Sequence, residues 1–261
     1  MTRRWIEIAD GVFARRHEDL DQTLGLVVGG ERCLVVDSGT DEVHGAEWLA
    51  AIREVTALPC TLLITHAHWD HFFGTAPFIP CPVLAHPVCR KEIAGNAEEH
   101  RARGLAYYGD SEGGRRHAAA RVVVPDTEVD PTLDVDLGGR VARLSHPGRG
   151  HTGGDVVVFL PDTRTLFAGD LVEQGAPPAI GKDAYPLAWP STMDTLLAMA
   201  PDVVVPGHGE LVDAAFVATQ RDELAVVAEL YRAVRAGELA TEEAISRAPY
   251  PESYVRGPLS A

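Results

Sequence analysis

The side chains best suited to chemistry lie in the segment THAHWDHFFG (65–74), which directly follows the apolar run CTLLI. His66 and His68 alternate in an extended chain, so both rings can point to the same side. Asp70 and His71 come as the chain turns into a helical segment, so they approach the same place from another side. A single metal ion takes about four protein ligands in a tetrahedron. Two converging groups within six residues therefore suit two metal ions better than one.

Further candidate ligands follow at the ends of later predicted strands. His151 lies in the glycine-rich turn HPGRGHTGGD, Asp170 ends the run TLFAGD, and His208 ends the run DVVVPGHG. Each of these residues alone has an ordinary explanation, because a histidine at a strand end is usually a hydrogen-bonded core residue. Together with the first segment, however, they indicate a metal site. Imidazole and carboxylate ligands favour zinc and are also compatible with iron or manganese.

The motifs THAHWDH, GHTGGD, FAGD and PGHG resemble the successive metal motifs of the metallo-β-lactamase superfamily. The earlier motif LVVDSGT, which contains Asp37, resembles the one that precedes them in that family. The resemblance implies an αββα sandwich with its site along one edge. It implies a first metal ion held by His66, His68 and His151, and a second held by Asp70, His71 and His208. It also implies that Asp170 bridges the two ions and that Asp37 orients the ligands.

A water molecule shared by two dications loses a proton near neutral pH and becomes a nucleophile. We therefore expect a hydrolase with two Zn²⁺ ions that opens an acyl bond with a metal-bridging hydroxide. Asp70 is the predicted catalytic residue, because it could orient the nucleophile and pass a proton to the leaving atom. Lactamases with the best-known zinc site carry cysteine where this chain has Asp170. That difference favours an ester, thioester or lactone as the substrate, with a β-lactam as a further option.

Two other functions stay open at this stage. A mononuclear non-haem iron oxidoreductase of the persulfide dioxygenase type resembles the same motif set. Enzymes of that type do not use the second group of histidines, so the presence of His71 and His208 argues against this reading. The other alternative is a metal-binding protein without catalytic turnover, which would hold the metal ions without hydrolysing a substrate.

Two segments resist assignment to a helix or strand and are predicted as cap loops over the site, at 104–120 and 172–191. Long irregular segments in compact domains are usually functional or mobile. The candidate substrate residues lie in them: Tyr107 and Tyr108 in the first, Tyr185 and Trp189 in the second. A solvated loop explains the two neighbouring tyrosines equally well. For Tyr185 and Trp189, packing in the hydrophobic core is an equally good explanation.

Short apolar strands occur in two sets, with amphipathic helices between and after them. Helices are expected at about 41–57, 87–103, 192–200 and 214–236. This arrangement predicts an α+β fold in the form of a four-layer αββα sandwich. One domain is expected over residues 1–261, with a C-terminal helical extension at 214–261. The helix that begins this extension could pack on the sandwich or form the face of a homodimer.

The overall composition limits the classes of partner that the protein is expected to bind. The 23 basic and 38 acidic side chains give a formal charge of −15, which disfavours a nucleic-acid partner. No apolar run approaches the length of a membrane span, and the first fifteen residues lack a signal-peptide pattern. We expect a cytoplasmic enzyme that acts on a small molecule, without a nucleic-acid or membrane partner. The four cysteines lack paired spacings and are predicted to be reduced core residues. His17, His44, His100 and His117 are expected on the solvated surface.

Overall fold

The structure is a computed structural model that describes residues 4–260. Within that range the strands form two sheets. The first has the order β1-β2-β3-β4-β5-β6-β7, antiparallel from β1 to β4 and parallel from β4 to β7. Its strands are β1 (Arg4–Ala9), β2 (Val12–Arg16), β3 (Thr23–Val28), β4 (Cys33–Val36), β5 (Cys60–Leu63), β6 (Val83–Ala85) and β7 (Thr127–Glu128).

The second sheet has the order β12-β11-β10-β9-β8. Its strands are β8 (Thr132–Asp136), β9 (Val141–Ser145), β10 (Val157–Leu160), β11 (Thr165–Glu173) and β12 (Val203–His208). The pairs from β8 to β11 are antiparallel, whereas β12 runs parallel to β11. Because β11 and β12 point the same way, Asp170 and His208 near their carboxyl ends lie at the same edge of the sheet.

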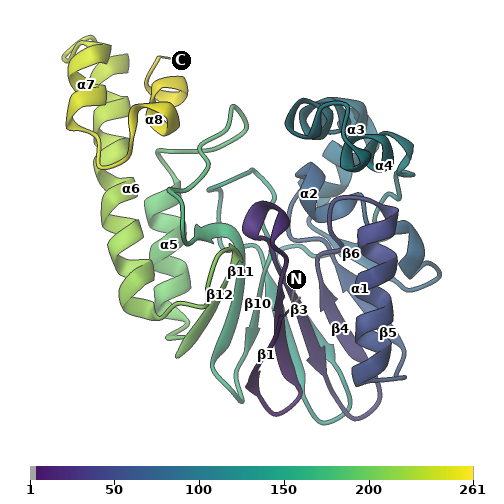
Figure 1. Cartoon of the computed structure of the whole chain (residues 1–261). Coiled ribbons are helices and arrows are strands. Elements are labelled where there is room, and N and C mark those ends of the chain that lie inside the picture. The colour runs from purple at the N-terminus through teal and green to yellow at the C-terminus, as the bar shows by residue number, and fades with distance from the viewer. Residues whose placement is uncertain (1–3, 261) are drawn as a thin grey trace.

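Successive side chains of a strand point to opposite faces of its sheet, and this alternation produces the layers of the fold. In β4, Leu34 and Val36 face the core between the two sheets, while Cys33 and Val35 face a second core with Trp48 of helix α1 (Glu42–Val55). On the far side, the second sheet packs against α5 (Trp189–Ala198) and α6 (Ala214–Arg235). Figure 1 shows α1 on one outer face and α5 and α6 on the other. The predicted four-layer αββα sandwich is confirmed.

The remaining helices gather at one end of the sandwich. They are α2 (Trp69–Phe72), α3 (Pro87–Tyr108), α4 (Glu112–Ala119), α7 (Thr241–Arg247) and α8 (Glu252–Leu259), with the 3-10 turn η1 (Asp19–Asp21). A second 3-10 turn, η2 (Ala76–Phe78), packs against α1. In Figure 1, α3 and α4 lie above the first sheet, and α7 and α8 lie above the second at the same end. Two helical groups therefore flank the strand ends that carry the candidate ligands.

The predicted cap loop at 104–120 is wrong, because α3 continues to Tyr108 and α4 covers most of the rest. The glycines that suggested a loop serve close packing instead. A Cβ at Gly104 would lie 2.3 Å from Nε2 of His117, and one at Gly114 would lie 2.1 Å from the carbonyl oxygen of Gly109. Since real Cβ atoms do not approach that closely, only glycine lets α3 and α4 meet here.

The predicted cap loop at 172–191 is partly wrong at both ends. Strand β11 extends through Glu173, and α5 begins at Trp189. The irregular segment is residues 174–188, called the 174–188 loop below. Tyr185 N donates to the carbonyl of Gly150 at 2.8 Å, so this loop is fastened to the turn that carries His151.

Two further predictions about single residues need correction. Cys60 and Cys81 form a disulfide, whereas Cys33 and Cys89 are free and buried as expected. The four histidines expected on the surface, at positions 17, 44, 100 and 117, are buried with 9% or less of each exposed. His44, His100 and His117 face inward from α1, α3 and α4, and the ring of His17 packs against that of His44. Within residues 4–260, no helix combines the length and apolarity needed to cross a membrane.

Candidate metal centre

The first candidate ligands follow the end of β5, where the chain passes from a buried strand into α2. His66 is buried and His68 is half-buried, and His68 is the residue that precedes the first turn of α2. Asp70 and His71 lie inside α2 and are buried as well. The change from extended to helical backbone directs the two pairs to the same place from different sides, as their spacing predicts.

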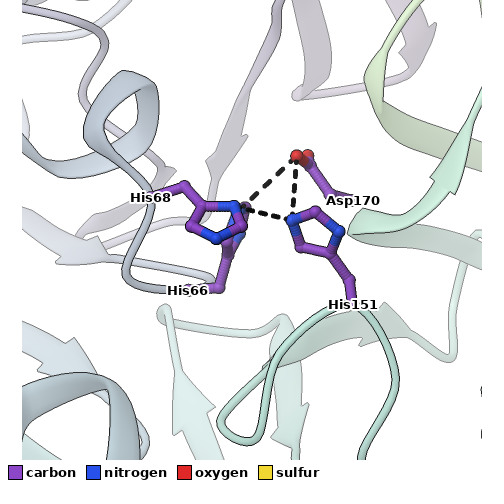
Figure 2. Close-up of side chains that lie close together, drawn as sticks. All are labelled: His66, His68, His151 and Asp170. Carbon is purple, nitrogen blue, oxygen red and sulfur yellow. Dashed lines mark hydrogen bonds and ion pairs between the residues drawn. The ribbon is translucent and has the colours of Figure 1, made fainter. Parts of the chain in front are cut away.

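The seven predicted side chains meet in two adjacent groups. His66, His68, His151 and Asp170 form one group, and Asp70, His71 and His208 form the other. Within each group the candidate ligand atoms lie within 4.8 Å of one another. Figure 2 shows the first group, with the rings of His66 and His68 from one segment facing His151 and Asp170 from two others.

Asp170 contacts both groups. Its Oδ2 lies 3.5 Å from Nε2 of His66 and 3.4 Å from Nε2 of His208. Its Oδ1 lies 3.3 Å from Nε2 of His71. A carboxylate in this position can bind one cation with each oxygen, which is the arrangement expected of a bridging ligand.

Each of the five histidines directs one ring nitrogen to a fixed partner and the other to the centre. The partners are Thr65 Oγ1 for His66 Nδ1, Asp183 Oδ2 for His68 Nε2, Asp37 Oδ2 for His71 Nδ1, the Ala179 carbonyl for His151 Nδ1 and the Leu20 carbonyl for His208 Nδ1. These distances are 2.8 to 3.1 Å. Partners of this kind fix the tautomer of metal-binding histidines and leave the second nitrogen unprotonated.

The ring nitrogens that point to the centre lie close to one another. His151 Nε2 lies only 2.7 Å from Nδ1 of His68, although the other nitrogen of each ring already donates elsewhere. His66 Nε2, His71 Nε2 and Asp170 Oδ1 are buried without a hydrogen-bond partner among the described residues. Buried polar atoms rarely remain unpaired. A cation between them would satisfy all of these atoms, so the donor set fits bound metal ions.

The charges within the cluster also favour a bound cation. Burial opposes ionisation of Asp70 and Asp170, yet the adjacent histidines outweigh it and hold both carboxyl pKa values well below their usual range. Burial lowers the pKa of His151 to about 4, with the charge of His68 adding to the effect. Burial, together with the charge of His71, likewise holds the pKa of His66 well below its usual range. Burial opposes protonation of His71 and His208 as well, yet the charges of Asp170 and Asp70 outweigh it and hold both pKa values well above their usual range. A metal ion bound there would take the place of the protons on these two rings.

A cavity of about 510 Å³ opens over the cluster. Its floor includes His68, Asp70, His151, Asp170 and His208. Its walls come from η1, α2, α3, the end of β11, the 174–188 loop and α8, through residues that include Leu20, Trp69, Arg103, Glu173, Ala179, Asp183 and Tyr254. The helical groups at the open end therefore supply part of the wall.

The four predicted substrate residues do not line this cavity. Tyr107 is 55% exposed, and Tyr108 donates its hydroxyl to Asp19. Both rings pack against Trp69, which itself reaches the cavity. Tyr185 lines a separate, smaller cavity, and Trp189 is fully buried with its indole N–H bonded to the Leu171 carbonyl. Core packing, the alternative weighed for Trp189, is therefore correct.

Two residues of the site, Asp183 and Gln22, are not predicted from the sequence. Asp183 accepts from His68 and lies 3.5 Å from Arg103 of α3. Gln22 donates from Nε2 to the Asp70 carbonyl. Both residues lie outside the metal motifs, and Asp183 lies in a segment without periodicity. The only signal is the irregular segment itself, which is expected to cover the site.

Comparison with known proteins agrees with this geometry. The family model described as the metallo-beta-lactamase superfamily matches residues 18–208. A Bacillus cereus protein named "Metallo-beta-lactamase type 2" is 27% identical over 195 residues, which cover 72% of this chain and 68% of that protein. A Bacteroides fragilis protein of the same name is 36% identical over 91 residues, which cover 33% of this chain and 36% of that protein. The fold is similar to that of a metallo-beta-lactamase from Pontibacter korlensis, with a TM-score of 0.66, 21% identity and coverage of 85% of this chain and 98% of that one.

Proposed function

Because the chain belongs to the metallo-β-lactamase superfamily, we propose that it is a dinuclear zinc hydrolase that cleaves an acyl bond in a small molecule. The observation that carries the proposal is the position of Asp170, whose two oxygens contact histidines of both candidate ligand groups. When bound, two zinc ions would lower the pKa of a shared water molecule and polarise the substrate carbonyl.

The protein's own side chains provide the remaining functions. Asp70 lines the cavity, and its Oδ2 lies 3.2 Å from Nε2 of His208. Gln22 fixes the backbone of Asp70 by donating to its carbonyl. A held carboxylate at the cavity floor can accept a proton from the attacking water and deliver it to the leaving atom. Trp69 and Tyr254 line the walls of the cavity, where a bound substrate would contact them.

The substrate class rests on the chemistry of position 170. A carboxylate there, in place of a thiolate, favours esters, thioesters and lactones, as argued from the motif. The relatives named "Metallo-beta-lactamase type 2" make β-lactams the second class to examine. The presence of His71 and His208 in one group with Asp70 favours two metal ions over the mononuclear iron alternative.

Metal analysis combined with an activity panel tests the proposal. Protein refolded or expressed with zinc should hold about two ions per chain and hydrolyse at least one ester, thioester, lactone or β-lactam. The Asp170→Ala variant should lose metal and turnover. The control variant Asp134→Ala, which removes an exposed carboxylate paired with Arg143, should retain both. One bound iron with oxygen consumption would favour the oxidoreductase instead. Tight metal binding without hydrolysis across the panel would favour the binding protein.

The compartment and the oligomeric state are also proposals. A cytoplasmic location follows from the sequence argument, yet the Cys60–Cys81 disulfide is of a kind that is rare in reducing compartments. Cell fractionation with thiol labelling of the native protein would decide between the two arguments. Light scattering would test the homodimer expected from the helix at 214–236.

A further inference from the structure

Glu173 is a buried carboxylate in the wall of the metal cavity that the proposed chemistry does not use. It ends β11, three residues after Asp170, and is only 8% exposed. It lines both the metal cavity and an adjacent cavity of about 350 Å³ beneath the 174–188 loop. Its Oε1 accepts the Ala179 N–H at 2.8 Å. Within residues 4–260, neither a hydrogen bond to Oε2 nor an ion pair to Glu173 is formed.

The other carboxylates around the metal cavity already have partners. Asp21 pairs with Arg16, and Asp183 contacts His68 and Arg103. Asp70 and Asp170 belong to the candidate metal cluster. Arg103 is the one arginine or lysine among the described residues that line the cavity. Glu173 is thus the cavity carboxyl group left without a cationic partner. Burial, together with the charge of Asp170, raises the pKa of Glu173 to about 8, and a cation bound beside it would favour the ionised form.

Two aromatic residues share this cavity. Trp69 of α2 and Tyr254 of α8 are half-buried and contribute to its walls. Aromatic faces attract organic cations, most strongly when water is excluded. The chain also carries a formal charge of −15, which raises the local concentration of cations and lowers that of anions.

We propose that Glu173 binds an ammonium group of the substrate, so that the enzyme selects cationic acyl substrates over neutral and carboxylate-bearing ones. This inference rests on the proposed hydrolase function and names the substrate class for the same cavity. Glu173 is a specificity residue in this account. The bond to be cleaved would lie over the metal cluster, and the ammonium group would lie toward the end of β11.

A purely structural role is the alternative, because Glu173 also holds the 174–188 loop through Ala179. The Glu173→Gln variant separates the two roles. Its amide oxygen can still accept the Ala179 N–H, but the negative charge is gone. Glu210→Gln is the matched control, since Glu210 is a 72% exposed carboxylate that pairs with Arg16 outside the metal cavity.

Three p-nitrophenyl esters of similar size provide the test: the 4-(trimethylammonio)butanoate, the uncharged 5,5-dimethylhexanoate and the hemiglutarate. For the zinc-loaded wild type and the control, kcat/KM should be at least about tenfold higher for the cationic ester than for the neutral one, and lowest for the anionic one. In Glu173→Gln, the preference for the cation should fall about tenfold. Equal rates for the three esters in the wild type, or a preference unchanged in Glu173→Gln, would overturn the inference.

A binding measurement keeps this inference separate from the proposed function. Calorimetry with butyltrimethylammonium should detect binding to the wild type and to Glu210→Gln, and binding weakened about tenfold in Glu173→Gln. Binding that depends on Glu173 without hydrolysis of any ester, thioester, lactone or β-lactam would support the cation site and refute the hydrolase. Hydrolysis without binding of the cation would support the hydrolase and refute the cation site.

Discussion

At the scale of single residues, the orientation of the candidate ligands depends on side chains behind them. Asp37 adopts a positive φ of 62° and accepts three hydrogen bonds, from Thr65 N, Thr65 Oγ1 and His71 Nδ1, each at 2.8 Å. Thr65 in turn contacts His66. One buried carboxylate therefore connects the end of β5 to a histidine of each group. This agrees with the ligand-orienting position that the motif LVVDSGT predicts for Asp37.

Replacing Asp37 with asparagine should weaken metal binding. An amide has one acceptor oxygen in place of two and lacks the charge that stabilises the His71 N–H donor. Loss of such a partner typically costs about 10- to 100-fold in metal affinity. Competition with a chelator of known affinity measures the effect. Asp134→Asn, on the exposed edge of β8, should leave the affinity unchanged. Equal affinities for wild type and Asp37→Asn would refute the orienting role.

Replacing Asp70 with asparagine tests proton transfer. The amide can still offer an oxygen to a cation but cannot take up a proton at neutral pH. With zinc saturating, we expect kcat to fall by about 10²- to 10⁴-fold. Atomic absorption on the same samples verifies the metal content. A variant that keeps both ions and full turnover would remove Asp70 from the catalytic role.

At the scale of elements, glycines decide how the helices above the first sheet meet. Gly104 of α3 faces the ring of His117 of α4, whereas a Cβ added at Gly95, on the exposed side of the same helix, would meet no atom within 4 Å. His117 also donates from Nδ1 to the Thr40 carbonyl at 2.7 Å, so its ring has little freedom to move away.

Alanine at these two glycines should have opposite effects. Gly104→Ala places a methyl group against the His117 ring and should destabilise the fold by about 1–3 kcal/mol. Gly95→Ala only removes backbone freedom from an exposed helical position and should stabilise it by about 0.5–1 kcal/mol. Urea unfolding followed by circular dichroism measures both changes. A similar effect of the two substitutions would contradict the packing explanation for Gly104.

The sequence predicts elements where a local pattern determines them. Alternating apolar residues in β4 and the apolar runs that end at His66, Asp170 and His208 place the strands and the edge they share. The prediction of a loop in the α3–α4 region is wrong because a glycine that permits close packing looks the same in sequence as one that ends a helix. The part played by Asp183 and the walls of the cavity depend on contacts between distant segments, which no local pattern records.

At the scale of the whole molecule, the candidate metal centre joins the two halves of the sandwich. His66, His68, Asp70 and His71 come from the first sheet and α2, whereas His151, Asp170 and His208 come from the second sheet and its loops. An isolated bridge between Gln22 and His208 connects the same two halves beside the cluster. Cations held there would bind the folded arrangement much more tightly, because the unfolded chain separates His151, Asp170 and His208 from the segment 66–71.

Metal removal should therefore lower the stability of the entire fold. A ligand that binds only the folded state adds about 4 kcal/mol when its free concentration is about 1,000 times Kd. Chelation also leaves Asp70, Asp170 and five buried or half-buried histidines together without a cation, which adds to the loss. Differential scanning calorimetry should show a single transition that moves to lower temperature with chelator and returns when zinc is restored. A control with chelator already saturated with calcium excludes an effect of the chelator itself. If the metal content falls to zero while the transition temperature stays constant, the centre does not hold the two sheets together.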